Sequence, residues 1–108
     1  MNNPQILDFA VHKIEGPVYT GRDRGEALRK NLNIEQLDAS AEPIHVLIPS
    51  STYTVSSSFF LGMFGPSVRK CGSIEKFNAK FHFSAPDSLM PLLAAHASRA
   101  LQGRKLLG

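Results

Sequence analysis

Residues 50–65 read SSTYTVSSSFFLGMFG and decide the fold that the sequence predicts. Eight of the nine residues from 50 to 58 carry a hydroxyl group, and an apolar run, Phe59–Phe64, follows directly. A short β-branched run, Ile44–Ile48, comes just before. This order predicts a strand, a polar turn and a helix. In open α/β sheets a functional site usually lies at such a turn, where N–H groups at the start of the helix face solvent.

The three consecutive serines, Ser56, Ser57 and Ser58, need a physical reason. A serine oxygen caps a helix by accepting a hydrogen bond from an N–H group of the first turn, and one serine is enough for that role. The other hydroxyls either bond to water or to nearby backbone in a tight turn, or they form a phospho-acceptor or anion-binding site. The helix dipole favours a phosphate at this position, so modification there would act as a switch.

The residues before this stretch predict two strands, a helix and a loop. Residues 6–14 alternate, with Leu7 and Phe9 on the more apolar side, as in a strand with one buried face. Residues 18–20 follow a Gly-Pro turn signal and predict a second strand, paired with the first as a hairpin. Residues 23–43 then predict a helix as far as Leu32 and a mostly polar loop after it.

The start of this helix carries both acidic and basic residues. Asp23 and Glu26 are spaced as a near capping box. Arg22 and Arg24 flank the start, where positive charge is slightly unfavourable against the helix dipole. That arrangement favours an anionic partner, and the alternative is two solvated surface arginines. The narrow apolar stripe of the helix consists of Ala27, Leu28 and Leu32.

The second half of the chain predicts a central strand, a broken helix, a strand and a final helix. Ile44–Ile48 is short and nearly continuous in apolar residues, as in a central strand covered on both faces. Pro66 predicts a kink or break near Gly65, because proline lacks an N–H group and clashes with the carbonyl four residues back. Residues 80–84 alternate as a half-exposed strand, and a final helix begins near Asp87.

Together these elements predict one α/β domain over residues 1–108. The expected architecture is a mixed sheet of about four strands backed by about three helices, with the hydroxyl-rich turn at one end. A chain of 108 residues is near the commonest domain size and can bury a substantial core.

Three segments resemble the bacterial STAS-like domain family of unknown function, which is related in fold to anti-sigma-factor antagonists. Ser56–Gly65 is similar to the family's serine-rich turn and Ser-Phe…Phe-Gly helix. Gly21–Arg29 is similar to its Arg-x-x-Gly-x-x-Leu/Phe-Arg helix start, and Phe77–Phe83 is similar to a segment that leads into a strand. The resemblance extends over residues 22–83.

This chain departs from the family at two places. Leu61 and Gly62 stand where members usually carry acidic residues, and Leu47-Ile48-Pro49 stands where an antagonist strand often ends in Asp. The resemblance implies a small STAS-like fold and a partner that is a histidine-kinase-like ATPase of the anti-sigma type. It also implies that Ser58 stands at the offset of the phospho-acceptor serine from the strand, with different neighbours here.

Composition narrows the function further. The net charge of +3 and the pI near 9.3 are mildly basic, but the cationic residues are scattered, and this does not favour nucleic-acid binding. No apolar run approaches the ~20 residues of a membrane span, and the first residues lack the features of a signal peptide. The single Cys71 fits a reducing cytoplasm.

The four histidines have no metal-ligand spacing along the chain, and no catalytic constellation is visible. We therefore expect no metal, no cofactor and no enzymatic activity.

The sequence therefore predicts a non-enzymatic cytoplasmic regulatory module that binds a protein partner through the serine turn and the helix after it. Two alternatives stay open: a small ligand- or nucleotide-binding domain that uses the same helix N-terminus, and an accessory nucleic-acid binder favoured by the pI alone. The predicted site residues are Ser56, Ser57, Ser58, Phe59, Arg22 and Arg24.

Overall fold

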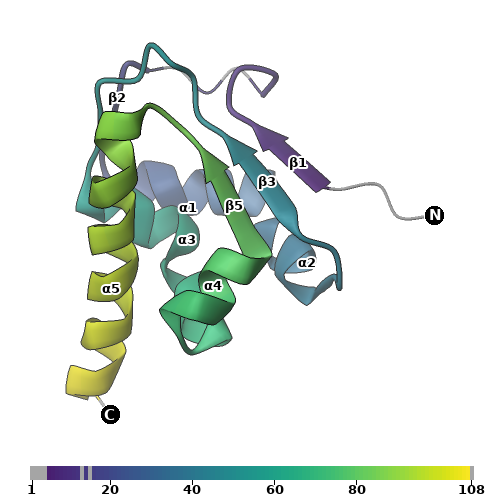
Figure 1. The fold of residues 1–108 in the computed structure, drawn as a ribbon, viewed down its shortest axis with the longest axis vertical. Helices are drawn as coiled ribbons and strands as arrows, with labels where there is room; N and C mark the ends of the chain where they lie inside the picture. The colour runs from purple at the N-terminus through teal and green to yellow at the C-terminus, as the bar shows by residue number, and fades with distance from the viewer. Residues whose placement is uncertain (1–4, 13, 15, 108) are drawn as a thin grey trace.

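The protein is α/β, and its strands form two small sheets (Figure 1). The computed structural model describes residues 5–12, 14 and 16–107. The elements in chain order are β1 (Gln5–Asp8), β2 (Val18–Tyr19), α1 (Arg22–Asn31), α2 (Ile34–Ala39), β3 (Ile44–Leu47), β4 (Thr54–Val55), α3 (Ser57–Cys71), α4 (Ile74–Lys80), β5 (Phe81–Ser84), the 3-10 turn η1 (Asp87–Leu89) and α5 (Met90–Leu107).

The sheets differ from the prediction in size and direction. One sheet has three strands in the order β1-β3-β5, and the other has the two strands β2 and β4. All of these pairings are parallel. The predicted mixed sheet of about four strands with about three helices is therefore corrected: the described residues form five parallel strands in two sheets and five α-helices.

The predicted hairpin between the first two strands is wrong. Strand β2 pairs with β4, so that Val18 lies opposite Thr54 and Tyr19 lies opposite Val55. The reason lies inside the hydroxyl-rich stretch, where Thr54 and Val55 are β-branched and suit a strand. Parallel partners are distant in the sequence, and no local turn signal marks them.

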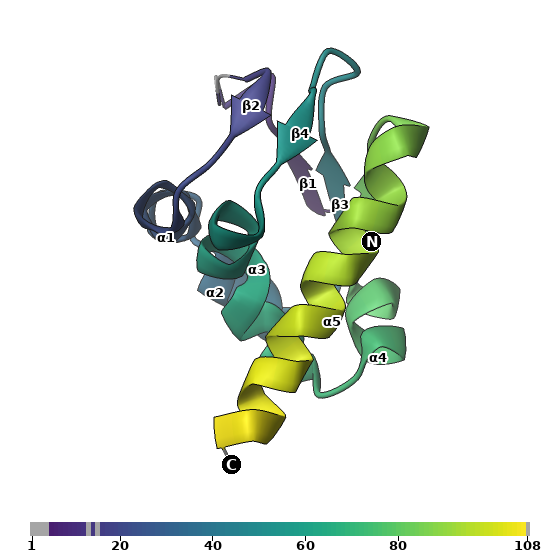
Figure 2. The same cartoon turned by 90° about the vertical axis from the view of Figure 1, so that its left-hand side faces the viewer.

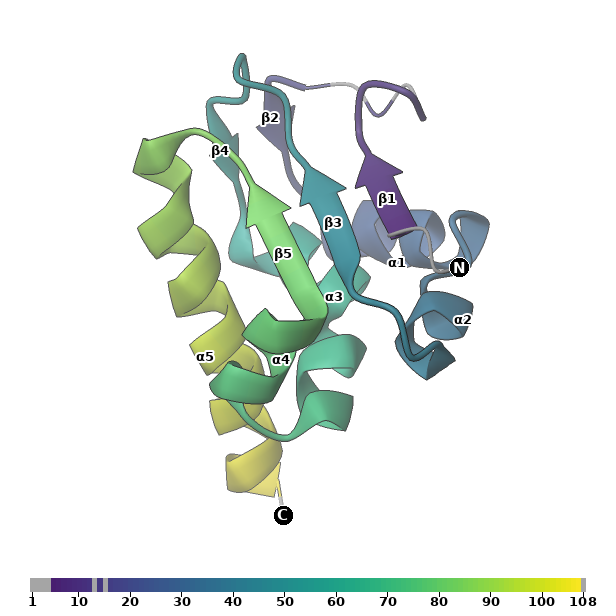
Figure 3. The same ribbon diagram turned by 45° about the vertical axis from the view of Figure 1, so that its right-hand side comes forward.

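The three-stranded sheet is covered on one face (Figures 1 and 3). Helices α1 and α3 lie behind it, where Ile44 and Val46 of the central strand are fully buried. On the opposite face Ile6 is 58% exposed and His82 is exposed. The central strand is therefore confirmed, but its predicted coverage on both faces is wrong. In Figure 1, α2 and α4 lie near the end of the sheet where the strands begin, so they leave the opposite face of the sheet uncovered.

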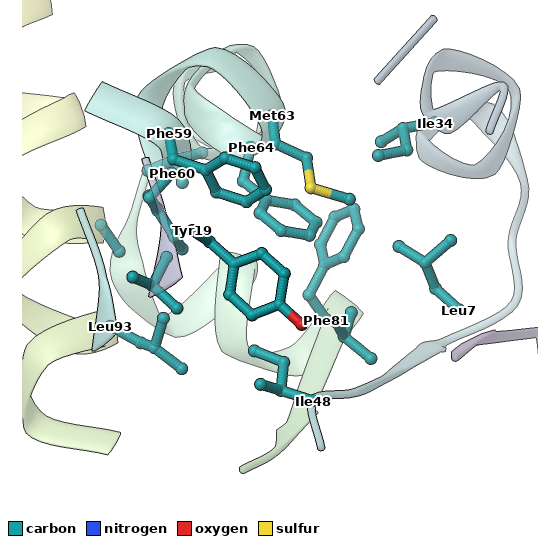
Figure 4. Packing of buried hydrophobic residues seen from close by; sticks show 14 of the residues in the cluster. Leu7, Tyr19, Ile34, Ile48, Phe59, Phe60, Met63, Phe64, Phe81 and Leu93 are labelled. Atoms are coloured by element: carbon teal, nitrogen blue, oxygen red, sulfur yellow. The ribbon is translucent and has the colours of Figure 1, made fainter. Parts of the chain in front are cut away.

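Aromatic rings fill much of the core between α3 and the sheet (Figure 4). Phe60 and Phe64 of α3 are buried, and both rings contact Phe83 of β5, with ring centroids 6.2 and 5.2 Å away. The Phe64 ring also packs edge-on against Phe81. This packing fixes α3 on the sheet, and the position of α3 in turn fixes the serine turn at its start.

Helix α3 is continuous through Pro66, so the predicted break near Gly65 is wrong. A proline costs a helix one hydrogen bond and crowds the carbonyl groups of the preceding turn. Here the carbonyl of Met63, three residues before the proline, accepts a hydrogen bond of 3.0 Å from the Arg29 side chain. The carbonyl that loses its helical donor to Pro66 is that of Gly62, so the Arg29 bond to Met63 ties α1 to α3. The buried packing of α3 holds the helix continuous.

The region around α1 and α2 corrects three further expectations. Gly21 is the N-cap residue of α1 and makes no side-chain cap, so Asp23 and Glu26 lie within the helix and form no capping box. The buried residues of α1 are Gly25 and Arg29. Of the predicted stripe, Leu28 and Leu32 pack against the core, whereas Ala27 is exposed. The predicted loop after α1 contains helix α2, whose first residue, Ile34, is fully buried.

Candidate functional site

Two strand–helix units lie side by side at the candidate site (Figure 2). Strand β2 leads into α1 and strand β4 leads into α3, and the two strands are paired in parallel. Immediately after the strands, the N–H group of Ser56 donates to the carbonyl of Tyr19 over 2.8 Å. Because the strands run in the same direction, the N-termini of both helices open at the same edge.

Helices α1 and α3 approach each other backbone to backbone. A methyl group placed on Gly25 would lie 2.2 Å from the Phe59 carbonyl oxygen, and one placed on Gly62 would lie 2.4 Å from the Arg22 carbonyl oxygen. Only glycine fits at such distances. This contact places the first turn of α1 beside the first two turns of α3, with the Arg22 backbone against Gly62 and Gly25 against Phe59.

The three serines have three different roles in the structure. Ser56 is the N-cap of α3, and its hydroxyl accepts from the N–H group of Phe59 over 3.1 Å. Ser57 is half-buried, and Ser58 is exposed on the first turn of the helix. No side-chain hydrogen bond to Ser58 is formed within the described residues, so its hydroxyl faces solvent and is chemically accessible.

Phe59 is 1% exposed, so a partner cannot dock directly on it. Its ring packs against Tyr19, with the ring centroids 5.5 Å apart. The guanidinium of Arg24 lies over both rings, 5.4 Å from the Tyr19 centroid and 5.8 Å from the Phe59 centroid. Phe59 therefore contributes to the site by holding Arg24 in place through cation–π contacts, whereas Arg22 is exposed.

Helix N-termini and basic side chains occur together at this edge. A helix N-terminus carries roughly half a positive charge, and here two such ends lie together with Arg22 and Arg24. The N–H groups of the first residues of a helix have no acceptor within the helix. Gly21 supplies no side chain to cap α1, and Ser56 caps one N–H group of α3. Asp23 is the acidic residue of these two first turns.

A buried ionic network lies farther along the α1–α3 contact, and sequence reasoning missed it. Arg29 donates to Asp38 and to Ser67, each over 2.8 Å, and Ser67 donates to the same Asp38 oxygen over 2.7 Å. The side chains of Arg29 and Asp38 are 10% and 3% exposed. The network joins α1, α2 and α3 and is fully hydrogen-bonded, which is typical of a structural role.

Hollows elsewhere on the molecule differ in chemistry. A polar hollow of about 500 Å³ lies between α1 and α2, and an apolar one of about 320 Å³ lies between α4, β5 and α5. A third hollow of about 330 Å³ lies at the carboxyl ends of β3 and β5, and it includes Ser50 and Ser84. In parallel sheets ligands commonly bind at that end of the strands.

Three further side chains are buried or partly buried. His96, expected to be a core histidine, is buried, and its Nε2 lies 2.8 Å from the Val55 carbonyl oxygen. Burial raises the pKa of the Cys71 thiol, with a further contribution from the nearby Asp38 carboxylate. Thr52 is buried in the loop after β3, and its hydroxyl has no hydrogen-bond partner among the described residues.

The fold and the site define a small α/β protein in which two helix N-termini, two arginines and several hydroxyl groups lie at one edge. Comparison with known proteins adds no name to this class: no protein-family model, curated protein or solved structure matches the chain. Among the described residues, no helix combines the length and the apolar character that a bilayer crossing requires.

Proposed function

We propose that the protein is a non-enzymatic cytoplasmic regulatory module that binds a protein partner through the serine turn and the first turns of α1 and α3. The carrying observation is the separation of roles among the serines. Ser56 performs the capping, which leaves Ser58 exposed and available for modification. The STAS-like resemblance supports the same function, and it suggests a histidine-kinase-like ATPase as the partner.

Phosphorylation of Ser58 is the proposed switch. A phosphate adds about −1.5 to −2 charges at neutral pH. It would sit on the first turn of α3, where the helix dipole stabilises it. Arg22 and Arg24 belong to the first turn of the neighbouring α1, and a guanidinium from there would pair with it. The bulk and charge of the phosphate would displace a partner from this edge without disturbing the core, because Ser58 makes no contact on which the fold depends.

The test compares baits that differ at Ser58. The wild type, Ser58→Ala and Ser58→Asp are used as baits to capture a partner. The affinity of each form, without its tag, for that partner is then measured by calorimetric titration. We expect Ser58→Ala to bind like the wild type and Ser58→Asp to bind about tenfold more weakly, a difference of about 1.4 kcal/mol.

The matched control is Ser98→Asp, which adds the same charge at an exposed serine of α5. It should leave both binding and unfolding unchanged. Equal affinity of Ser58→Asp and the wild type for the partner would contradict the switch and make the serine turn a structural feature.

A small-ligand function is the second candidate, and the hollow at the carboxyl ends of β3 and β5 favours it. That hollow includes Ser50 of the hydroxyl-rich stretch, although it does not include the α3 N-terminus. Amide NMR with added ATP or inorganic phosphate separates the candidates. Shifts confined to the amide signals of Ser50, Ser84 and Ala85 support the ligand function, and an unchanged spectrum there removes it.

A further inference from the structure

Two segments of the chain, residues 29–39 and 69–79, share a pattern of residues. They read RKNLNIEQLDA and RKCGSIEKFNA, so that Arg, Lys, Ile, Glu and Ala recur at matching positions. Each segment contains the end of a longer helix, a two-residue connection and most of a short helix, α1–α2 in the first and α3–α4 in the second. The strand after each short helix begins with an apolar residue and a histidine, Ile44-His45 in β3 and Phe81-His82 in β5.

The structure repeats together with the sequence. The elements β1, β2, α1 and α2 are followed by β3, β4, α3 and α4 in the same order. Counterparts lie beside each other, because β1 pairs with β3, β2 pairs with β4 and α1 packs against α3. A third, shorter unit consists of β5, η1 and α5, which join β3 and α3 on their other side. Figure 2 shows α1, α3 and α5 in one row. This arrangement is typical of repeat proteins, whose units stack on their neighbours.

The two ends of the stack present strand edges with free backbone groups. At β1, the N–H groups of Gln5 and Phe9 donate toward the chain of β3, over 3.4 and 3.0 Å, so Ile6 between them turns its N–H and carbonyl groups to the outer edge. At β5, the carbonyl of Ser84 accepts from the chain of β3 over 2.8 Å, so the neighbouring Phe83 turns its backbone groups outward. Within the described part of the chain, no strand pairs with either outer edge. Such edges are templates for pairing with a further strand.

The apolar hollow of about 320 Å³ lies beside β5, at this end of the stack. Side chains of β5, α4 and α5 line it, among them Phe81, Phe83, Met90 and Leu93. Met90 is 40% exposed, and Ala94, which also lines the hollow, is exposed. Inside the chain, the next unit covers the corresponding surface, because β5 pairs with β3 and α5 packs against α3. The hollow therefore lies where a further unit of the stack would fit.

We propose that a second copy of this chain occupies that place, with its β1 added in parallel to the outer edge of β5. The repeat identifies the occupant. Strand β3, the counterpart of β1, meets the preceding unit by the same edge that is free in β1, and β5 presents the edge that β3 uses toward the following unit. The contact therefore continues an interface that the chain already forms between its own units. It joins two different surfaces head to tail, so it does not close at a dimer. It uses the sheet edges and goes beyond the function proposed for the serine turn.

Sedimentation velocity of the untagged chain tests the association. The mean mass of the wild type should rise with protein concentration and continue beyond that of a dimer. Ile6→Pro removes the outward N–H group of β1, and an edge strand tolerates proline at such a position. Ala94→Arg places a long charged side chain in the hollow. Each of these two variants should stay monomeric when alone. Ile6→Thr is the matched control, because it keeps the N–H group and a β-branched side chain, and it should still associate.

The two blocked variants mixed together give the sharpest test. Ile6→Pro keeps an intact β5 edge and Ala94→Arg keeps an intact β1 edge, so an equimolar mixture should form a dimer with one chain of each kind. Thermal unfolding checks each fold, and Met90→Arg blocks the same hollow if Ala94→Arg is unstable. A wild type that stays monomeric at every concentration would overturn the proposal. So would Ile6→Pro chains that associate as the wild type does, or a mixture that stays monomeric.

Discussion

At the scale of single residues, the side chain of Arg29 links three helices. Its guanidinium binds a carboxylate, a hydroxyl and a backbone carbonyl on two other helices. Removing one partner of a buried ion pair leaves the other charge buried without compensation, and that penalty usually exceeds the value of the pair itself.

Replacement of Arg29 by methionine should therefore cost about 3–5 kcal/mol of the free energy of unfolding, because Asp38 would remain charged and buried. Urea denaturation monitored by circular dichroism measures the loss. Lys30→Met is the control, because Lys30 is the exposed neighbour on the same helix and should change stability by about 0.5 kcal/mol or less. A loss below about 1 kcal/mol in Arg29→Met would show that the network is dispensable.

Cys71 should react slowly with alkylating reagents in the folded protein. Burial and the Asp38 carboxylate raise the thiol pKa above its ordinary value of 9.0, so the folded chain holds less of the reactive thiolate at a given pH. In that alkaline range the unfolded chain releases its thiol proton first, so stability falls as the pH rises through it. Iodoacetamide kinetics across pH 7–10, with and without urea, provide the measurement. Equal rates with and without urea would contradict the raised pKa.

At the scale of elements, the contact between α1 and α3 controls how the candidate site is assembled. Gly25 and Gly62 allow the two backbones to meet, which sets the first turn of α1 against the first turns of α3.

Gly62→Ala should destabilise the protein by about 1–3 kcal/mol, because the new methyl group would meet the Arg22 backbone and force the helices apart. Thermal or urea unfolding measures the change, and Gly25→Ala should behave in the same way. Gly65→Ala is the matched control within α3, since its methyl group would meet only the flexible Arg69 side chain at 3.3 Å. There the better helix propensity of alanine offsets the contact. Equal stability of Gly62→Ala and Gly65→Ala would contradict the close approach.

At the scale of the whole molecule, the elements could be predicted far better than their pairing. The strand at Ile44–Leu47 and the helix after the serines follow from hydrophobic pattern and capping, which are local properties. Strand partners and the open sheet face depend on contacts between distant segments. Arg29 was missed because one arginine on a polar helix looks solvated, and its acceptors, Asp38 and Ser67, come from other helices.

The parallel pairing of the strands also has a consequence for how the chain folds during synthesis. Strand β1 has no hydrogen-bonded neighbour until Ile44–Leu47 has been made, and β3 gains its second neighbour only with Phe81–Ser84. Sheets without local hairpins form slowly, because distant segments must meet before any strand is paired. Until α3 emerges, Tyr19 has no Phe59 ring to cover it. The nascent first half of the chain therefore exposes apolar residues to other molecules. The yield of folded protein in a cell should therefore depend on chaperones and on a moderate rate of translation.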